Sequence, residues 1–195
     1  MFNDLSSPLS YLASRRSGRA REMVGPGPDE AELGAILALA ARTPDHGKLA
    51  PWRFVVVGPD QRDEFAALLA RALDANDPQA GAAHRLKAEE FARHGEALVV
   101  LLSAPVIPHK IPMWEQELSV GAAAMNLLHA VHAHGFVGSW LTGWAAYDPL
   151  VRAAFCTGEQ ERIAGFFFIG SPGRDLEERP RPDMTAVVRS WTPPL

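Results

Sequence analysis

Apolar residues recur three and four positions apart in several segments of this chain, which is the spacing of one face of an amphipathic helix. The longest such segment begins at Pro112 and ends at Gly135, a glycine in the position that commonly follows a helix C-terminus. Another is expected to stop where Thr43 precedes Pro44, because the residue before a proline disfavours the helical conformation. Six helices are predicted in all. The helix that stops at Thr43 starts near Pro28–Asp29. The remaining helices start near Ser7–Pro8, at Asp60 as N-cap, at Pro78 for a helix that runs to Gly95, and at Asp148–Pro149.

Strands are indicated by a different pattern. The runs Ala97–Leu102 and Phe166–Ile169 are apolar at consecutive positions, which is typical of strands that helices bury on both faces. We therefore predict an α+β or α/β domain with helices on both sides of one sheet. The strands are expected at Trp52–Val57, Ala97–Ser103, Val137–Leu141 and Ile163–Ile169, with Thr185–Trp191 as a candidate fifth.

The length of the chain suits one domain. With 195 residues, of which 47% are hydrophobic, a single core can form without a disulfide or a structural metal. No repeat is detectable, and the last 24 residues contain five prolines, which favours an extended tail over another packed helix. We expect a single domain over residues 1–172, with residues 173–195 as its extended C-terminal arm.

Charge and cysteine content narrow the function. The chain has 19 Lys and Arg against 23 Asp and Glu, and this net charge of −4 disfavours a nucleic-acid-binding domain. No apolar run approaches the roughly 20 residues of a membrane-spanning helix, and the first residues lack the pattern of a secretory signal. The single cysteine, Cys156, excludes a disulfide framework and indicates a core thiol in a cytoplasmic protein. A small-molecule function is favoured.

Common catalytic signatures are absent. The chain has no G-x-G-x-x-G, G-x-x-x-x-G-K-[ST], G-x-S-x-G or H-E-x-x-H motif, which disfavours Rossmann, P-loop, α/β-hydrolase and zinc-protease chemistry. His129 and His132 have a helical spacing that could share a metal ion, but no third ligand stands at a recognisable spacing. Because the helix dipole favours histidines near a helix C-terminus, we expect no metal site.

Three local clusters are not explained by a packed core. The first, Arg15-Arg16-Ser17-Gly18-Arg19, offers guanidinium groups and a hydroxyl suited to a bidentate grip on a phosphate dianion. A run of this kind is also common as a solvated basic turn. Another group of arginines, Arg174, Arg179 and Arg181, stands near the end of the chain.

The second cluster is the polar loop 42–47, followed by Pro51-Trp52-Arg53-Phe54 at the start of a predicted strand. Loops at the ends of rigid elements commonly bind ligands, although a simple turn with an Asp–His hydrogen bond fits the same residues. The third cluster, residues 135–143, is a strand bracketed by glycines, which let a flat ligand approach the backbone closely.

In this order, the segments resemble the FMN-dependent nitroreductase family, and more narrowly its small single-domain branch of NAD(P)H nitroreductases. The similarity extends over most of the chain. It rests on six collinear motifs: the Arg15-Arg16-Ser17 turn, Arg42-Thr43-Pro44-Asp45-His46, Pro51-Trp52-Arg53-Phe54, Pro112-Met113-Trp114-Glu115-Gln116-Glu117, the G-F-x-G-x-W stretch from Gly135 to Trp140, and the ending Phe167–Pro172.

The resemblance implies a nitroreductase-like α+β fold, with a helix-flanked mixed or antiparallel sheet and a C-terminal arm that crosses to the partner of a homodimer. Two FMN sites would lie at the subunit interface. By position, the phosphate and ribityl end of FMN would meet Arg15, Arg16 and Ser17, the helix-to-strand loop would contribute Arg42 and His46, and the other side of the flavin would meet Trp140, Leu141 and Thr142. Residues 130–135 fall in the region that contacts the nicotinamide nucleotide.

The implied reaction passes a hydride from NAD(P)H through flavin N5 to a nitroaromatic, a quinone or a related acceptor, and requires no catalytic side chain. Two residues depart from the family pattern: Ala50 stands where Gln is frequent, and Leu141 where the narrow branch has Arg. Two alternatives stay open. The protein could reduce another electrophilic substrate with the same cofactor, or it could bind a flavin or another ligand without turnover.

Overall fold

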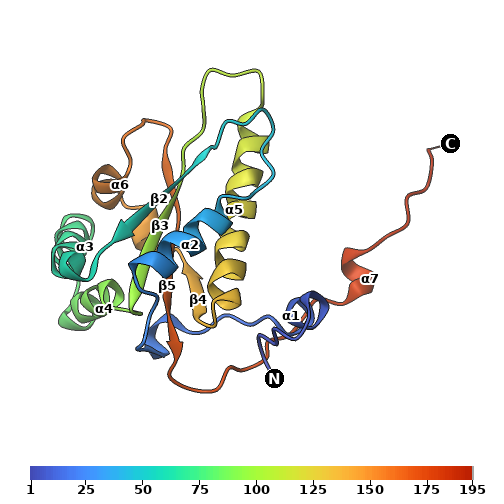
Figure 1. Cartoon of the computed structure of the whole chain (residues 1–195). Helices are drawn as coiled ribbons and strands as arrows, with labels where there is room; N and C mark the ends of the chain where they lie inside the picture. Colours follow the sequence, from blue (N-terminus) through green and yellow to red (C-terminus); the bar gives the residue numbers. More distant parts are fainter. Residues whose placement is uncertain (195) are drawn as a thin grey trace.

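The structure is a computed structural model that describes residues 1–194, and a five-stranded sheet forms its centre (Figure 1). Every strand pair is antiparallel. The long strand β5 pairs with β3 along one edge and with β4 and β1 along the other, and β2 continues the sheet beyond β3. The strands are β1 (Met23–Val24), β2 (Trp52–Val57), β3 (Ala97–Ser103), β4 (Val137–Leu141) and β5 (Arg162–Pro172).

Helices cover both faces of this sheet. One face packs against α3, α4 and α6, and the other against α2 and α5. The helices are α1 (Pro8–Ser14), α2 (Glu30–Ala40), α3 (Arg62–Asn76), α4 (Ala82–Ala92), α5 (Met113–Ala133), α6 (Pro149–Phe155) and α7 (Met184–Val187), with 3₁₀ turns η1 (Ala20–Glu22), η2 (Pro59–Gln61) and η3 (Trp144–Ala146).

The three consecutive phenylalanines of β5 explain why the run is apolar without alternation. Phe166 and Phe168 belong to the core under α3 and α4, whereas Phe167 belongs to the core under α5. All three are fully buried. Because successive strand residues point to opposite faces, only a sheet covered on both sides can bury all of them. The predicted helix-covered sheet is confirmed.

Most predicted boundaries agree with the structure. The strands 52–57, 97–103 and 137–141 are confirmed to the residue, and β5 is longer than expected at both ends. Ser7, Asp29 and Asp148 cap α1, α2 and α6 through side-chain oxygens, as their positions predict. Gly135 follows α5 with a φ of 86°, the left-handed conformation that makes glycine suitable there.

Four expectations were wrong in part. Residues 185–191 form no strand, because the Asp183 side chain accepts from Thr185 N and starts the short helix α7. Asp60 is not the N-cap of α3, since it lies inside η2. The helix expected from Pro78 begins only at Ala82, and α2 ends at Ala40, three residues before the predicted stop.

Beyond β5 the chain turns back past the end of α1 and then leaves the body of the molecule (Figure 1). The helix α7 on this segment has no buried residue, and neither has α1. Over residues 1–194, no helix combines the length and the apolar character that crossing a membrane requires.

Candidate functional site

The basic turn Arg15–Arg19 connects α1 to η1 and is fixed in place by its surroundings. The Asn3 side chain donates to Arg16 O (3.0 Å) and accepts from Arg16 N (2.8 Å). A Cβ atom at Gly18 would lie 2.8 Å from Val137 Cγ2, so glycine is what lets the turn pack on the start of β4. The turn therefore has a defined position at one end of an edge strand.

Among the arginines of this turn, Arg15 has the fewest hydrogen-bond and ion-pair partners. Its Nη1 donates to Ser17 Oγ over 3.2 Å, and no carboxylate within residues 1–194 pairs with it. Burial lowers the pKa of the Arg15 guanidinium, and nearby Arg181, Arg16 and Arg179 act in the same direction. A half-buried guanidinium crowded by other cations favours an anionic ligand. This environment differs from that of a solvated basic turn.

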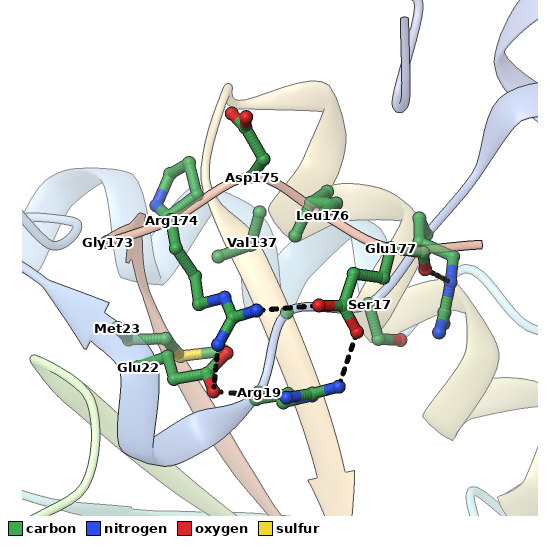
Figure 2. A pocket seen from close by; sticks show the side chains of 13 residues that line it. Ser17, Arg19, Glu22, Met23, Val137, Gly173, Arg174, Asp175, Leu176 and Glu177 are labelled. Atoms are coloured by element: carbon green, nitrogen blue, oxygen red, sulfur yellow. Dashed lines mark hydrogen bonds and ion pairs between the residues drawn. The ribbon is translucent and has the colours of Figure 1, made fainter. Parts of the chain in front are cut away.

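Ion pairs fasten the start of the C-terminal arm beside this turn (Figure 2). Arg19 pairs with Glu22 (3.2 Å) and Glu177 (2.6 Å), and Arg174 pairs with the same two carboxylates (3.3 and 2.6 Å). The four side chains form a closed ring of alternating charge. Arg16 Nε also donates to Glu177 O over 2.5 Å. The cavity among these residues measures only about 30 Å³, and both Nη atoms of Arg19 already donate to carboxylates.

The predicted residues of β4 point to different sides of the sheet. Trp140 stacks on Phe167 with ring centroids 5.3 Å apart, and its Nε1–H donates to Ala164 O (3.0 Å). Leu141 packs against the core of the opposite face, and Thr142 lies just beyond the strand. The strand partner of β4 within residues 1–194 is β5 alone. A flat ligand can therefore contact all three residues only along the outer edge of β4.

A pocket of about 360 Å³ opens beside Thr142, between the β4–η3 connection and the helices α3 and α4. Its wall is mainly apolar and includes Leu73, Phe91 and Trp144, while Lys87 and Asp77 contribute charges of opposite sign. Both the volume and the character of the wall suit a small aromatic molecule. From Val137 to Leu141 the strand spans roughly 13 Å, so the pocket and the basic turn stand at opposite ends of one edge.

The predicted polar loop follows α2. Its start is tied to α5, because Asn126 Nδ2 donates to Arg42 O (3.1 Å) and to Thr43 Oγ1 (2.9 Å). His46 Nδ1 lies 2.6 Å from Glu115 Oε2, in the first turn of α5. Ala50 has a φ of 47°, and its N–H donates to Asp45 Oδ2 (2.6 Å). The Arg42 and His46 side chains are exposed.

Within one chain, the structure holds His46 far from the basic turn. Glu115, next to His46, lies at the first turn of α5, whereas His129, next to Tyr11 and the basic turn, lies at its last turns. At about 1.5 Å per residue these positions are roughly 20 Å apart along the helix. Figure 1 shows the loop after α2 at one end of α5 and α1 at the other.

Some residues of this region were not identified from the sequence. Arg179 and Arg181 approach Arg15, a proximity that no sequence spacing reveals. His129 and His132, weighed only as metal ligands, instead hydrogen-bond Tyr11. Across residues 1–194, no group of three His, Cys, Asp or Glu side chains is arranged to hold a metal ion. Cys156 is only partly buried at the edge of a core, and burial raises the pKa of its thiol.

Comparison with known proteins gives consistent matches. The model of the "Nitroreductase family" matches residues 12–171. A relative from Escherichia coli strain K12, named "Putative NAD(P)H nitroreductase YdjA", is 34% identical over 164 residues, which cover 84% of this chain and 87% of the relative.

Solved structures share the fold. A nitroreductase-like family protein from Bacillus cereus superposes with a TM-score of 0.78 at 18% identity, covering 94% of this chain and 96% of that one. The structure described as "a putative nitroreductase in complex with FMN" from Desulfovibrio desulfuricans has a TM-score of 0.71 at 19% identity and covers 96% of this chain and 99% of its own.

Proposed function

The chain belongs to the nitroreductase family, and on that premise we propose that it is an FMN-dependent oxidoreductase that transfers reducing equivalents from NAD(P)H to a nitroaromatic, a quinone or a related acceptor. When bound, FMN supplies N5, which accepts a hydride from NAD(P)H and delivers it to the acceptor. The observation that carries the proposal is a phosphate-type clamp at the start of a free strand edge, with an apolar pocket at the other end of that edge.

The donor set at the basic turn fits a phosphate monoester. Arg15 and Ser17 are already oriented toward each other, and Arg16 lies beside them with its Nε fixed by Glu177 O. Charge-assisted hydrogen bonds from guanidinium groups to a phosphate are about twice as strong as bonds between neutral groups. We assign the phosphate and the ribityl end of FMN to Arg15, Arg16 and Ser17.

The edge of β4 and the pocket suit the flat part of the cofactor and its acceptor. Trp140 is 39% exposed and Thr142 lines the pocket, so both can contact a ring lying along the edge. The apolar wall excludes water from the acceptor, and the protein thereby orients it without a nucleophile or a general acid. Leu141 adds apolar surface to the core, at a position where the resemblance to the narrow branch makes Arg frequent.

A homodimer with shared sites is the second part of the proposal. The roughly 20 Å between Glu115 and His129 along α5 keeps His46 away from the basic turn of the same chain, so a second copy has to supply His46. Apolar side chains without cover support this arrangement: Leu9 of α1 is 78% exposed and Trp191 of the arm is 81% exposed. The arm 173–195 would cross to the partner. A cytoplasmic location completes the proposal.

Mixed dimers test the shared site. One chain carries Arg15→Ala, the other carries His46→Ala, and different affinity tags allow isolation of the mixed dimer. Each altered homodimer is expected to bind little flavin, whereas the mixed dimer retains one intact site and about half of the wild-type flavin. A mixed dimer as empty as both homodimers, beside a loaded wild-type dimer, would show that each site lies within one chain.

The cofactor and the reaction need separate measurements. Chromatography of the chromophore released by heat is expected to give FMN, and FAD would overturn the assignment. Under anaerobic conditions NADH or NADPH is expected to bleach the yellow protein, and an added nitroaromatic or quinone should restore the colour. A yellow protein that neither nucleotide bleaches would favour the alternative of a binding protein without turnover.

A further inference from the structure

The attachment of α1 to the rest of the molecule is unusual. None of its residues is buried, and its leucines point to solvent. Tyr11 is half-buried, with its ring edge-on against the imidazoles of His129 and His132 on α5. The position of α1, and of the basic turn that follows it, therefore depends on polar contacts more than on apolar packing.

These contacts form a chain of hydrogen bonds with a defined direction. Gly138 N–H of β4 donates to His132 Nε2 (3.3 Å), so the proton of the neutral imidazole stands on Nδ1. His132 Nδ1–H then donates to Tyr11 Oη (3.2 Å), and the Tyr11 hydroxyl donates to His129 Nδ1 (2.8 Å). Burial lowers the pKa of His132 to about 3, which keeps this imidazole neutral and the direction of the chain fixed at neutral pH.

The chain of hydrogen bonds lies next to Arg15. Arg15 follows Tyr11 by four residues, so the two side chains leave the same face of α1. The guanidinium of Arg15 is close enough to lower the pKa values of Tyr11, His129 and His132 through its charge, although burial, the largest effect, raises the pKa of Tyr11 to about 12. The phenol and both imidazoles are neutral neighbours of Arg15. They do not neutralise its guanidinium, which stays available to an anion.

We propose that Tyr11 is a positioning residue for the phosphate of the cofactor: by bridging His129 and His132 it fixes α1 against α5 and β4, and so orients Arg15, Arg16 and Ser17. The inference rests on the proposed FMN function of the same turn. Phenylalanine cannot replace Tyr11, because His132 Nδ1–H would lose its acceptor and His129 Nδ1 its donor, and a buried polar group without a partner is costly.

The test compares Tyr11→Phe with Tyr147→Phe, which removes the hydroxyl of an exposed tyrosine outside the proposed site. The affinity of the purified dimer is measured for FMN and for riboflavin, which has the same ring and ribityl chain but no phosphate. We expect Tyr11→Phe to weaken FMN binding about tenfold and to change riboflavin binding less than about twofold, since one lost buried hydrogen bond corresponds to a change of that order. Tyr147→Phe should alter neither affinity.

His129→Ala serves as a second variant, because it removes the acceptor of the Tyr11 hydroxyl while the hydroxyl and His132 stay in place. It should lower the FMN affinity several-fold with riboflavin unchanged. In ¹⁵N-histidine NMR spectra, the His132 signals of the wild type should show a protonated Nδ1, and this state should be lost or mixed in Tyr11→Phe. If FMN and riboflavin lose affinity equally, or if neither changes, the positioning role is wrong. A wild-type protein that binds no FMN would instead overturn the proposed function.

Discussion

The two ends of α5 hold the two halves of the proposed site, and they differ in how completely one chain builds them. At the end that we call the clamp end, Arg15, Ser17, Tyr11, His129 and His132 form a half-buried set of directed hydrogen bonds. At the other end, His46 of the loop 41–50 meets Glu115 in the first turn of α5, while Asn126, farther along the helix, holds the start of the loop. We call this loop the loop end, and its Arg42 and His46 side chains face solvent.

This difference shows which half is preorganised. The clamp end satisfies its buried polar groups inside one chain, so its geometry exists before any ligand or partner arrives. The loop end holds its backbone through Asn126 and Asp45, but within residues 1–194 the Arg42 side chain has no hydrogen-bond or ion-pair partner. An exposed arginine side chain adopts one fixed orientation only when a second molecule covers it and removes its water. We therefore expect changes at the clamp end to have the larger effects.

The largest expected effect is the acid sensitivity that His132 gives to the clamp end. Burial holds the pKa of folded His132 at about 3, below the ordinary value of 6.5, so the unfolded chain takes up a proton that the folded chain refuses. The free energy of unfolding should therefore be highest above pH 6.5 and fall from there to about pH 3. The contribution of His132 is at most about 1.4 kcal/mol per pH unit.

Denaturant titrations between pH 7 and pH 4 measure this slope. His132→Asn should reduce this slope by the contribution of His132, at most about 1.4 kcal/mol per pH unit. Tyr11→Phe should keep the slope, because burial and not the tyrosine is the main cause of the low pKa of His132. Equal slopes in wild type and His132→Asn would show that His132 is not buried in the folded protein in solution.

The next largest effect is expected from Arg15→Ala. Removal of the least engaged guanidinium of the clamp end should weaken FMN binding about 10- to 100-fold, since a hydrogen bond to a charged group contributes roughly 1.5–3 kcal/mol. Isothermal titration with FMN measures the change. Arg21→Ala, at a nearby arginine whose side chain is 70% exposed, is the matched control and should bind FMN as the wild type does. Unchanged affinity in Arg15→Ala would remove Arg15 from the site.

A smaller effect is expected at the loop end. Arg42→Ala should weaken FMN binding less than about tenfold, because the side chain is exposed in the single chain and contributes only where the partner covers it. Lys48→Ala changes a cation of the same loop and should have no effect. If Arg42→Ala costs as much affinity as Arg15→Ala, the two ends are equally organised and the contrast between them is wrong.

The smallest effect concerns the ring of ion pairs at the root of the arm. Glu177→Gln should lower the free energy of unfolding by no more than about 1 kcal/mol, because its partners Arg19 and Arg174 are largely exposed. The difference should shrink in high salt. Glu89→Gln, which breaks an exposed pair with Arg93 on α4, is the control and should leave FMN binding unchanged, whereas Glu177→Gln should weaken it slightly.

The local pattern of the sequence was sufficient for much of the fold. Consecutive apolar residues such as Phe166–Phe168 indicate burial on both faces, and caps such as Asp29 and Asp148 mark helix starts, because both signals act through neighbouring residues. A local signal also explains why the strand predicted at 185–191 is wrong. A local cap at Asp183 starts a helical turn there, and no sheet neighbour is present within residues 1–194 to favour a strand.

The sequence by itself determined that this chain has a helix-covered sheet, a basic turn at Arg15–Arg19 and the motifs of the nitroreductase family. Only the tertiary structure decided which side chains meet: Tyr11 with His129 and His132, Glu177 with Arg19 and Arg174, and His46 with Glu115. Local signals depend on the few residues around them, whereas these contacts, apart from the Glu177–Arg174 pair, join positions 60 or more residues apart and follow from how whole helices pack on the sheet.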